Sequence, residues 1–248
     1  MKSKINSSVL ILFVLSFMLT SCYEKSPKKE TPKEVRWVTE SVEYIGICKQ
    51  TYAMAWDRVR STAESTNGPW AVVLDVDETV LNNAQYEIEL HQKGETFSSQ
   101  SWTAWVERRD ATAIPGVKQF LDNVRSLGEN AFVVFITNRD AHHEKATIDN
   151  LIKEQLWHDG DVILCRKEKS DTKQIRRNEI IEASGRCAGL PKKQIIALFG
   201  DNLKDFYEVD GTAGLTKIKD AAMQDSRWGT KFFVLPNPMY GSWVDAYK

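Results

Sequence analysis

Short uninterrupted apolar runs alternate along the chain with segments whose apolar residues recur at helical spacing. The runs, which are typical of buried parallel strands, cover residues 71–74, 131–136, 161–164, 195–199 and 231–235. The helical pattern covers residues 116–127, 141–155 and 173–183. This alternation predicts an α/β fold built on a doubly wound parallel sheet.

Ahead of the first run, residues 34–66 carry apolar positions such as Trp37, Cys48 and Tyr52 at helical spacing, with no proline among them. We expect one long helix or two shorter ones here. We interpret residues 34–248 as one catalytic domain, because roughly 210 residues suit a single α/β domain and no repeat divides them.

The first residues have the layout of a secretory signal, because Lys2 and Lys4 precede an uncharged apolar run over residues 9–19. That run is shorter than the roughly 20 residues of a membrane-spanning helix, so we favour a cleaved signal peptide over residues 1–21. Residues 22–33 are rich in Lys, Glu, Pro and Ser, which predicts a flexible tether.

The signal ends in Leu19-Thr20-Ser21-Cys22, which resembles the lipobox of bacterial lipoproteins. The resemblance implies cleavage before Cys22, a diacylglycerol thioether on its sulfur and an acyl chain such as palmitate on its amino group. Two or three acyl chains make a stable membrane anchor. The alternative is an ordinary signal peptide with an incidental cysteine.

Charge and cysteine content exclude other classes. The formal charge is −1, and loss of Lys2 and Lys4 with the signal takes it to −3, so nothing resembles the basic stripe of a protein that binds nucleic-acid polymers. Cys48, Cys165 and Cys187 lack the spacing of a zinc site, and we expect buried free thiols.

Carboxylates follow two of the predicted strands. Asp75 and Asp77 come after the first, with one residue between them, and Asp201 follows the fourth. Active sites of such sheets lie beyond the carboxyl ends of the strands, so these acids should meet there. Mg²⁺ is the cation that best suits a few carboxylates and a substrate phosphate oxygen. A carboxylate in such a site can attack phosphorus and form an aspartyl-phosphate.

The residues 75–80, Thr137 after an apolar strand, a lysine and the stretch 200–206 together resemble, in order, the four motifs of the haloacid dehalogenase superfamily. More narrowly, Val73–Leu81 and Leu198–Phe206 resemble the paired signatures of class C bacterial acid phosphatases, which include lipoprotein 5′-nucleotidases. The resemblance extends from the lipobox to Trp243. It implies a Rossmann-like core with a small, mainly helical cap, here residues 82–114.

The resemblance also implies roles for single residues. Asp75 matches the nucleophile and a metal ligand, and Asp77 matches the general acid and base that offers its carbonyl to the metal. Asp201 matches the remaining metal carboxylate, and Asp205 matches the fourth aspartate, which supports the metal site. Thr137 matches the phosphate-binding hydroxyl, and we place Asn138 beside it in the phosphate site. Taken singly, each aspartate could instead cap a helix or form a turn.

The lysine is less well fixed, since the loop 167–173 offers several. We choose Lys173, which stands three residues before Arg176 as in the family pattern, and keep Lys169 in reserve. His142 and His143 follow the second motif on a predicted helix, and we give them no catalytic role.

Trp102 and Tyr240 resemble aromatic residues of the family that line the substrate entrance. Two rings could stack on a nucleobase, which predicts nucleoside monophosphates as substrates. Core packing is the competing interpretation for both rings.

We therefore expect a magnesium-dependent phosphomonoesterase, with an acid optimum because Asp77 must be protonated when the leaving group departs. The alternatives are a surface lipoprotein that binds nucleotides or other ligands without turnover, and a phosphotransferase with the same intermediate. We expect an exported lipoprotein, outer-membrane if the cell has such a membrane, because Tyr23 gives no inner-membrane retention signal; the resemblance also suggests a homodimer.

Overall fold

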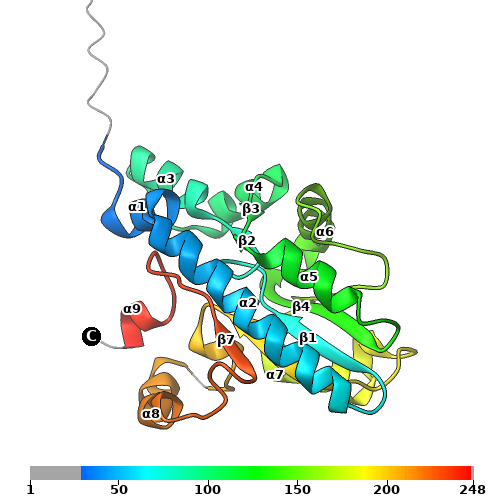
Figure 1. Ribbon diagram of the computed structural model, residues 1–248. Coiled ribbons are helices and arrows are strands. Elements are labelled where there is room, and N and C mark those ends of the chain that lie inside the picture. The colour runs from blue at the N-terminus through cyan, green and yellow to red at the C-terminus, as the bar shows by residue number, and fades with distance from the viewer. Residues whose placement is uncertain (1–28, 210, 247–248) are drawn as a thin grey trace, which may run out of the picture.

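The computed structural model describes residues 29–209 and 211–246. The predicted signal peptide, Cys22 and most of the tether lie outside these residues. A parallel five-stranded sheet forms the centre, in the order β5-β4-β1-β6-β7 (Figure 1). Its strands are β1 (Trp70–Leu74), β4 (Ala131–Asp140), β5 (Val162–Arg166), β6 (Gln194–Gly200) and β7 (Phe232–Val234). All five predicted strands are confirmed, and with them the parallel α/β fold.

The sheet is buried on both faces, which is why its strands are apolar without alternation. Along β1, Val72 and Leu74 enter the core on one face, whereas Ala71 and Val73 enter the core on the other. Successive side chains of a strand point to opposite faces, so each strand serves both cores.

Helices pack on both faces of the sheet. The first core is covered by α2 (Val42–Ser65), α5 (Val117–Arg125) and α6 (Glu144–Lys153), and the second by α7 (Lys173–Glu182). In Figure 1, α2 and α5 lie in front of the sheet and α7 lies behind it. Other helical elements are α1 (Lys33–Glu40), η1 (Ala141–His143), η2 (Gly185–Cys187), η3 (Leu203–Asp205), α8 (Gly211–Met223) and α9 (Trp243–Ala246).

The amino-terminal helical segment is two helices, the second of the two alternatives. Ser41 separates α1 from α2 with an extended backbone, and its hydroxyl accepts a hydrogen bond from the Tyr44 N–H. A serine in this position satisfies one of the free N–H groups at a helix start.

The segment between β1 and α5 forms a small unit at one end of the sheet. It contains β2 (Leu81–Asn82), α3 (Ala84–Lys93), α4 (Ser99–Arg108) and β3 (Thr112–Ala113), and β2 pairs with β3 in antiparallel fashion. Figure 1 shows α3 and α4 above the end of the sheet where β1 leads into β2. This is the segment for which we expected a cap.

The three cysteines of the described domain are free and buried, as predicted. Burial raises the pKa of Cys48 to about 11 and that of Cys165 to about 12, so both are protonated thiols at neutral pH. Within residues 29–209 and 211–246, no helix has the length and apolar character needed to cross a bilayer.

Candidate active site

Two aspartates stand side by side at the carboxyl end of the sheet. Asp75 follows β1 and Asp201 follows β6, the neighbouring strand, and the Asp75 N–H donates to the Phe199 carbonyl at 3.0 Å. The chain passes from β1 to β4 on one side and later returns through α7 to β6 on the other. Ligands of open α/β sheets bind at such a reversal of strand order.

Asp205 completes a cluster of three carboxylates. Single carboxylate oxygens of Asp75, Asp201 and Asp205 all lie within 4.8 Å of one another. Gly200 makes the approach of Asp205 possible, because a Cβ at this position would lie 2.3 Å from the Asp205 Cβ. Asp205 is further fixed by the Asn202 N–H, which donates to its Oδ2 at 2.9 Å.

Lys173 supplies the cation that faces this cluster. Its Nζ lies 2.5 Å from Asp75 Oδ1 and 2.6 Å from Asp205 Oδ1, and the side chain is buried. Lys173 is the first residue of α7, so the amino end of that helix points at the same place. Lys169 lies instead in an adjacent cavity, apart from the aspartates.

The pKa values of Asp75, Asp201 and Lys173 are shifted by burial and by the charges around them. Burial, reinforced by Asp205 and Asp77 and opposed by Lys173, raises the pKa of Asp75 to about 7. Burial and the nearby Asp205 and Asp75 also raise the pKa of Asp201. Burial lowers the pKa of Lys173, but the two carboxylates outweigh it and leave the pKa raised. A bound cation would relieve the repulsion among these acids.

Asp77 lines the same cavity but has its own partner, Arg139. Arg139 Nη2 lies 2.7 Å and its Nε 3.0 Å from Asp77 Oδ1, and the arginine is only 2% exposed. Asn83 Nδ2 donates to the same oxygen at 3.0 Å. The Asp77 carboxylate is therefore oriented by two side chains from two separate elements.

Glu78 links this loop to the carboxyl-terminal part of the chain. Its backbone is left-handed, with φ 53°, a conformation that costs a non-glycine residue about 1 kcal/mol or more. Its Oε1 accepts hydrogen bonds from the Asn83 N–H, from Asn83 Nδ2 and from the Tyr240 hydroxyl, each at 2.9 Å. Burial raises the pKa of Glu78 to about 7, although these hydrogen bonds oppose the shift.

The loop over residues 235–242 closes one side of the cavity through three such contacts. Besides the Tyr240 bond to Glu78, Asn237 Nδ2 donates to Asp201 Oδ2 at 2.8 Å and the Ser242 hydroxyl donates to Asn202 Oδ1 at 2.6 Å. Tyr240 and Ser242 line the cavity together with the aspartates.

Thr137 and Asn138 follow the apolar part of β4, beside Asp75. Thr137 is fully buried, and its Oγ1 accepts from the Arg139 N–H at 3.1 Å, which leaves the hydroxyl hydrogen available as a donor. Arg176, also fully buried, donates to the Thr137 carbonyl and, at 2.7 Å, to Asn138 Oδ1. Asn138 lines the cavity of the aspartates, whereas Thr137, its neighbour in sequence, does not.

Trp102 and Tyr240 do not share a cavity wall. Trp102 packs edge-on against Tyr86, with ring centroids 5.2 Å apart, and beneath Arg139, whose guanidinium carbon lies 5.6 Å from its ring centre. Tyr240 alone of the two lines the aspartate cavity, with its hydroxyl already bonded to Glu78. Stacking on a nucleobase stays a prediction for both.

Sequence reasoning assigned no role to Arg139, Asn83, Glu78 or Asn237. Arg139 carried a signal, because an arginine directly after Thr137-Asn138 at a buried strand end needs a buried anion. Glu78 and Asn237 carried no such signal, because their contacts with Tyr240 and Asp201 join residues that are 162 and 36 positions apart in the sequence. His143 is buried and contacts Thr103 across 3.1 Å, a structural position apart from the aspartates.

The chain is similar in sequence and in structure to known phosphatases and related proteins. The chain is 26% identical to acid phosphatase 1 of Solanum lycopersicum, over 87% of this chain and 77% of that protein, and 27% identical to the stem 31 kDa glycoprotein of Glycine max, over 68% and 58%. Among solved structures, it resembles the class C acid phosphatase of Bacillus anthracis with tungstate bound, with a TM-score of 0.72, 29% identity and 86% of each chain covered.

A family model also matches nearly the whole chain. It describes the acid phosphatases of haloacid dehalogenase subfamily IIIB and matches residues 19–243, a span that contains the paired aspartates, the buried lysine and the strand ends that bring them together. The chain belongs to this acid phosphatase family of the haloacid dehalogenase superfamily and is a phosphoric monoester hydrolase.

Proposed function

We propose that this phosphatase hydrolyses nucleoside monophosphates, depends on Mg²⁺ and works through an aspartyl-phosphate on Asp75. The observation that carries the proposal is the meeting of Asp75, Asp201 and Asp205 with the Lys173 ammonium in one cavity at the carboxyl end of the sheet.

Asp75 is the nucleophile of this reaction. A carboxylate oxygen of Asp75 forms a bond to phosphorus while the bond from phosphorus to the leaving oxygen breaks. Lys173, already within 2.6 Å of two carboxylate oxygens, is placed to neutralise phosphate oxygens. Thr137 is buried next to Asn138 of the cavity wall, and we propose that its hydroxyl, which accepts from the Arg139 N–H and retains its hydrogen, donates to a phosphoryl group that enters the site.

Asp77 moves the proton in both steps. When protonated, it donates to the leaving oxygen, and the resulting carboxylate then takes a proton from the water that attacks phosphorus and regenerates Asp75. Arg139 and Asn83 hold the carboxylate in one orientation for both transfers.

The acid cluster fits a divalent cation. Three carboxylates within 4.8 Å of one another, two of them with raised pKa values, form an oxygen-rich site of the kind that Mg²⁺ occupies. Asp75, Asp201 and Asp205 would hold the ion, with the Asp77 carbonyl as a further ligand. A bound Mg²⁺ neutralises charge on the phosphate.

The nucleotide part of the proposal rests on Tyr240, an aromatic residue that lines the cavity. The proposal that the protein is exported rests on the lipobox. We propose that the mature protein begins at Cys22, carries acyl chains there and lies outside the cytoplasm. Loss of the protein from the membrane fraction in Cys22→Ala would support this anchor, whereas unchanged membrane attachment would contradict it.

A panel of phosphomonoesters assayed for phosphate release with and without a chelator tests the activity. We expect nucleoside 5′-monophosphates to be cleaved with higher kcat/KM than sugar phosphates. We also expect the chelator to abolish activity and added Mg²⁺ to restore it. Full activity in the chelator would contradict the metal requirement. Equal rates for all leaving groups would contradict the nucleotide preference alone.

A further inference from the structure

A second cavity adjoins the active site and shares part of its wall. Asn138, Lys173 and Lys204 line both cavities. The second cavity extends away from Asp75 and Asp201 toward β5 and the start of α7, and neither aspartate lines it. A group in this cavity would therefore lie next to the reacting phosphate without replacing it.

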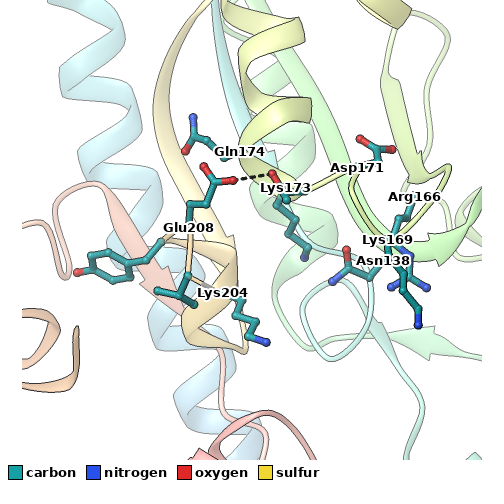
Figure 2. Close-up of a pocket in the computed structure, with 11 residues that line it drawn as sticks. Asn138, Arg166, Lys169, Asp171, Lys173, Gln174, Lys204 and Glu208 are labelled. Atoms are coloured by element: carbon teal, nitrogen blue, oxygen red, sulfur yellow. Dashed lines mark hydrogen bonds between the residues drawn. The ribbon is translucent and has the colours of Figure 1, made fainter. Parts of the chain in front are cut away.

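Cationic side chains outnumber carboxylates in the lining of this cavity. Arg166 is the last residue of β5, Lys169 lies in the loop after it and Lys204 lies in η3. Figure 2 shows Arg166 and Lys169 beside Asn138 on one side, with Lys204 opposite. Within the described part of the chain, Lys169 and Lys204 have no carboxylate partner within 4.0 Å, whereas Arg166 pairs with Asp140 at 2.7 Å.

The carboxylates of the wall only partly offset these charges. Asp171 is committed to Arg186, whose Nη2 lies 3.1 Å from Asp171 Oδ1. Glu208 accepts a hydrogen bond from the Thr172 hydroxyl at 2.9 Å and lies away from Lys169 in Figure 2. Within residues 29–209 and 211–246, the charges of Lys169 and Lys204 are therefore left without a paired carboxylate, whereas that of Arg166 is offset by Asp140.

We propose that this second cavity binds a phosphate group beside the one that is hydrolysed, with Arg166, Lys169 and Lys204 as its cationic contacts. Cations from three separate elements surround a multi-oxygen anion better than a single pair would. The bound group is either a second phosphate on the leaving group of a bisphosphate substrate or free inorganic phosphate. The inference rests on the nucleotide hydrolysis proposed above.

The test compares adenosine 5′-monophosphate with adenosine 3′,5′-bisphosphate at constant free Mg²⁺. The variant is Arg166→Gln/Lys169→Gln, since neither residue lines the aspartate cavity. Its control is Arg60→Gln/Lys192→Gln, which removes the same charge from exposed residues of α2 and of the loop before β6. Hydrolysis of adenosine 5′-monophosphate by the unaltered protein reports on the proposed function separately.

If the second phosphate belongs to the substrate, the variant loses about five- to tenfold in kcat/KM for the bisphosphate and less than twofold for the monophosphate. If free phosphate is the ligand, the variant changes kcat/KM equally for both substrates. Inorganic phosphate should then inhibit the unaltered protein with a noncompetitive component, and this component should be absent in the variant. The inference is overturned if the enzyme is active and neither change occurs, or if variant and control lose activity equally, which indicates only long-range attraction of anions.

Discussion

Arg139 holds the carboxylate of Asp77 through two of its nitrogens, at 2.7 and 3.0 Å from Asp77 Oδ1, while only 2% of the arginine is exposed. If Asp77 donates the proton to the leaving group, its orientation matters most when that group is a poor one. We expect Arg139→Gln to lower kcat about 10- to 100-fold for alkyl phosphates and much less for p-nitrophenyl phosphate.

The ratio of the two rates is the diagnostic measurement, because a simple loss of folded protein lowers both rates together. Arg139→Lys, which keeps the charge but loses the fork of nitrogens, should show a smaller change of the same kind. Equal losses on both substrates in soluble, folded variants would contradict the positioning role.

Glu78 should make the metal-free protein less stable as pH rises. Its pKa is raised to about 7 in the folded chain, above the ordinary value of 4.5. Between these two values the folded state binds more protons, so the stabilisation present below pH 4.5 is lost as pH rises through 7, by about 3 kcal/mol.

Glu78→Gln removes this titration while retaining an oxygen that can accept from Asn83 and Tyr240. The free energy of unfolding of the variant, minus that of the unaltered protein, should therefore be larger at pH 8 than at pH 4.5. Both values come from urea denaturation in a chelator. Glu64→Gln, at an exposed position on α2, is the matched control. An unchanged difference between the two pH values would show that Glu78 does not titrate in this range.

Mg²⁺ should stabilise the fold, and more so at higher pH. The raised pKa values of Asp75 and Asp201 mean that protons compete with the ion, and the ion binds the ionised acids. At about 100 times its dissociation constant, the ion adds about 2.7 kcal/mol. We expect a clear rise in Tm at pH 7.5, a smaller one at pH 5 and almost none in Asp201→Asn. A rise of the same size in Asp201→Asn would contradict the assigned site.

Substitutions of Tyr240 and Trp102 should show which of the two rings contacts the nucleobase and which only packs in the core. Tyr240→Phe removes the bond to Glu78 and should cost about 1 kcal/mol of stability while KM for nucleotides stays nearly constant. Tyr240→Ala removes the ring and should raise that KM about 5- to 100-fold. Trp102→Ala should mainly lower Tm, because Trp102 packs on Tyr86 outside the cavity. If Trp102→Ala raised KM for nucleotides alone, the result would support stacking of the nucleobase between Trp102 and Tyr240.

The strands and the acids at their ends could be read from the sequence for a physical reason. A strand buried on both faces must be apolar throughout, so Val72–Leu74 and Ile196–Phe199 stand out, and the polar residues that follow them mark the edge of the sheet. Of the two lysines considered for the third of the four motifs, Lys173 is the one whose Nζ contacts Asp75.

The partners of these acids could not be read in the same way. Asn237 reaches Asp201, and Tyr240 reaches Glu78, only because the last loop folds back over the site. The separation of Trp102 from Tyr240 is likewise a matter of where α4 packs, which local pattern does not specify. Sequence periodicity predicts the face on which a residue lies, not its partner on another element.

Phosphate release by Asp75→Asn tests directly whether Asp75 is the nucleophile. The substitution keeps the size of the side chain but removes the nucleophilic oxygen, and the protein is to be shown folded by circular dichroism and by its Tm. We predict a loss of at least about 10³-fold in kcat with Mg²⁺ present, and no phosphoryl group trapped on the protein after acid quenching. Activity within tenfold of the unaltered protein would contradict catalysis through an aspartyl-phosphate on Asp75.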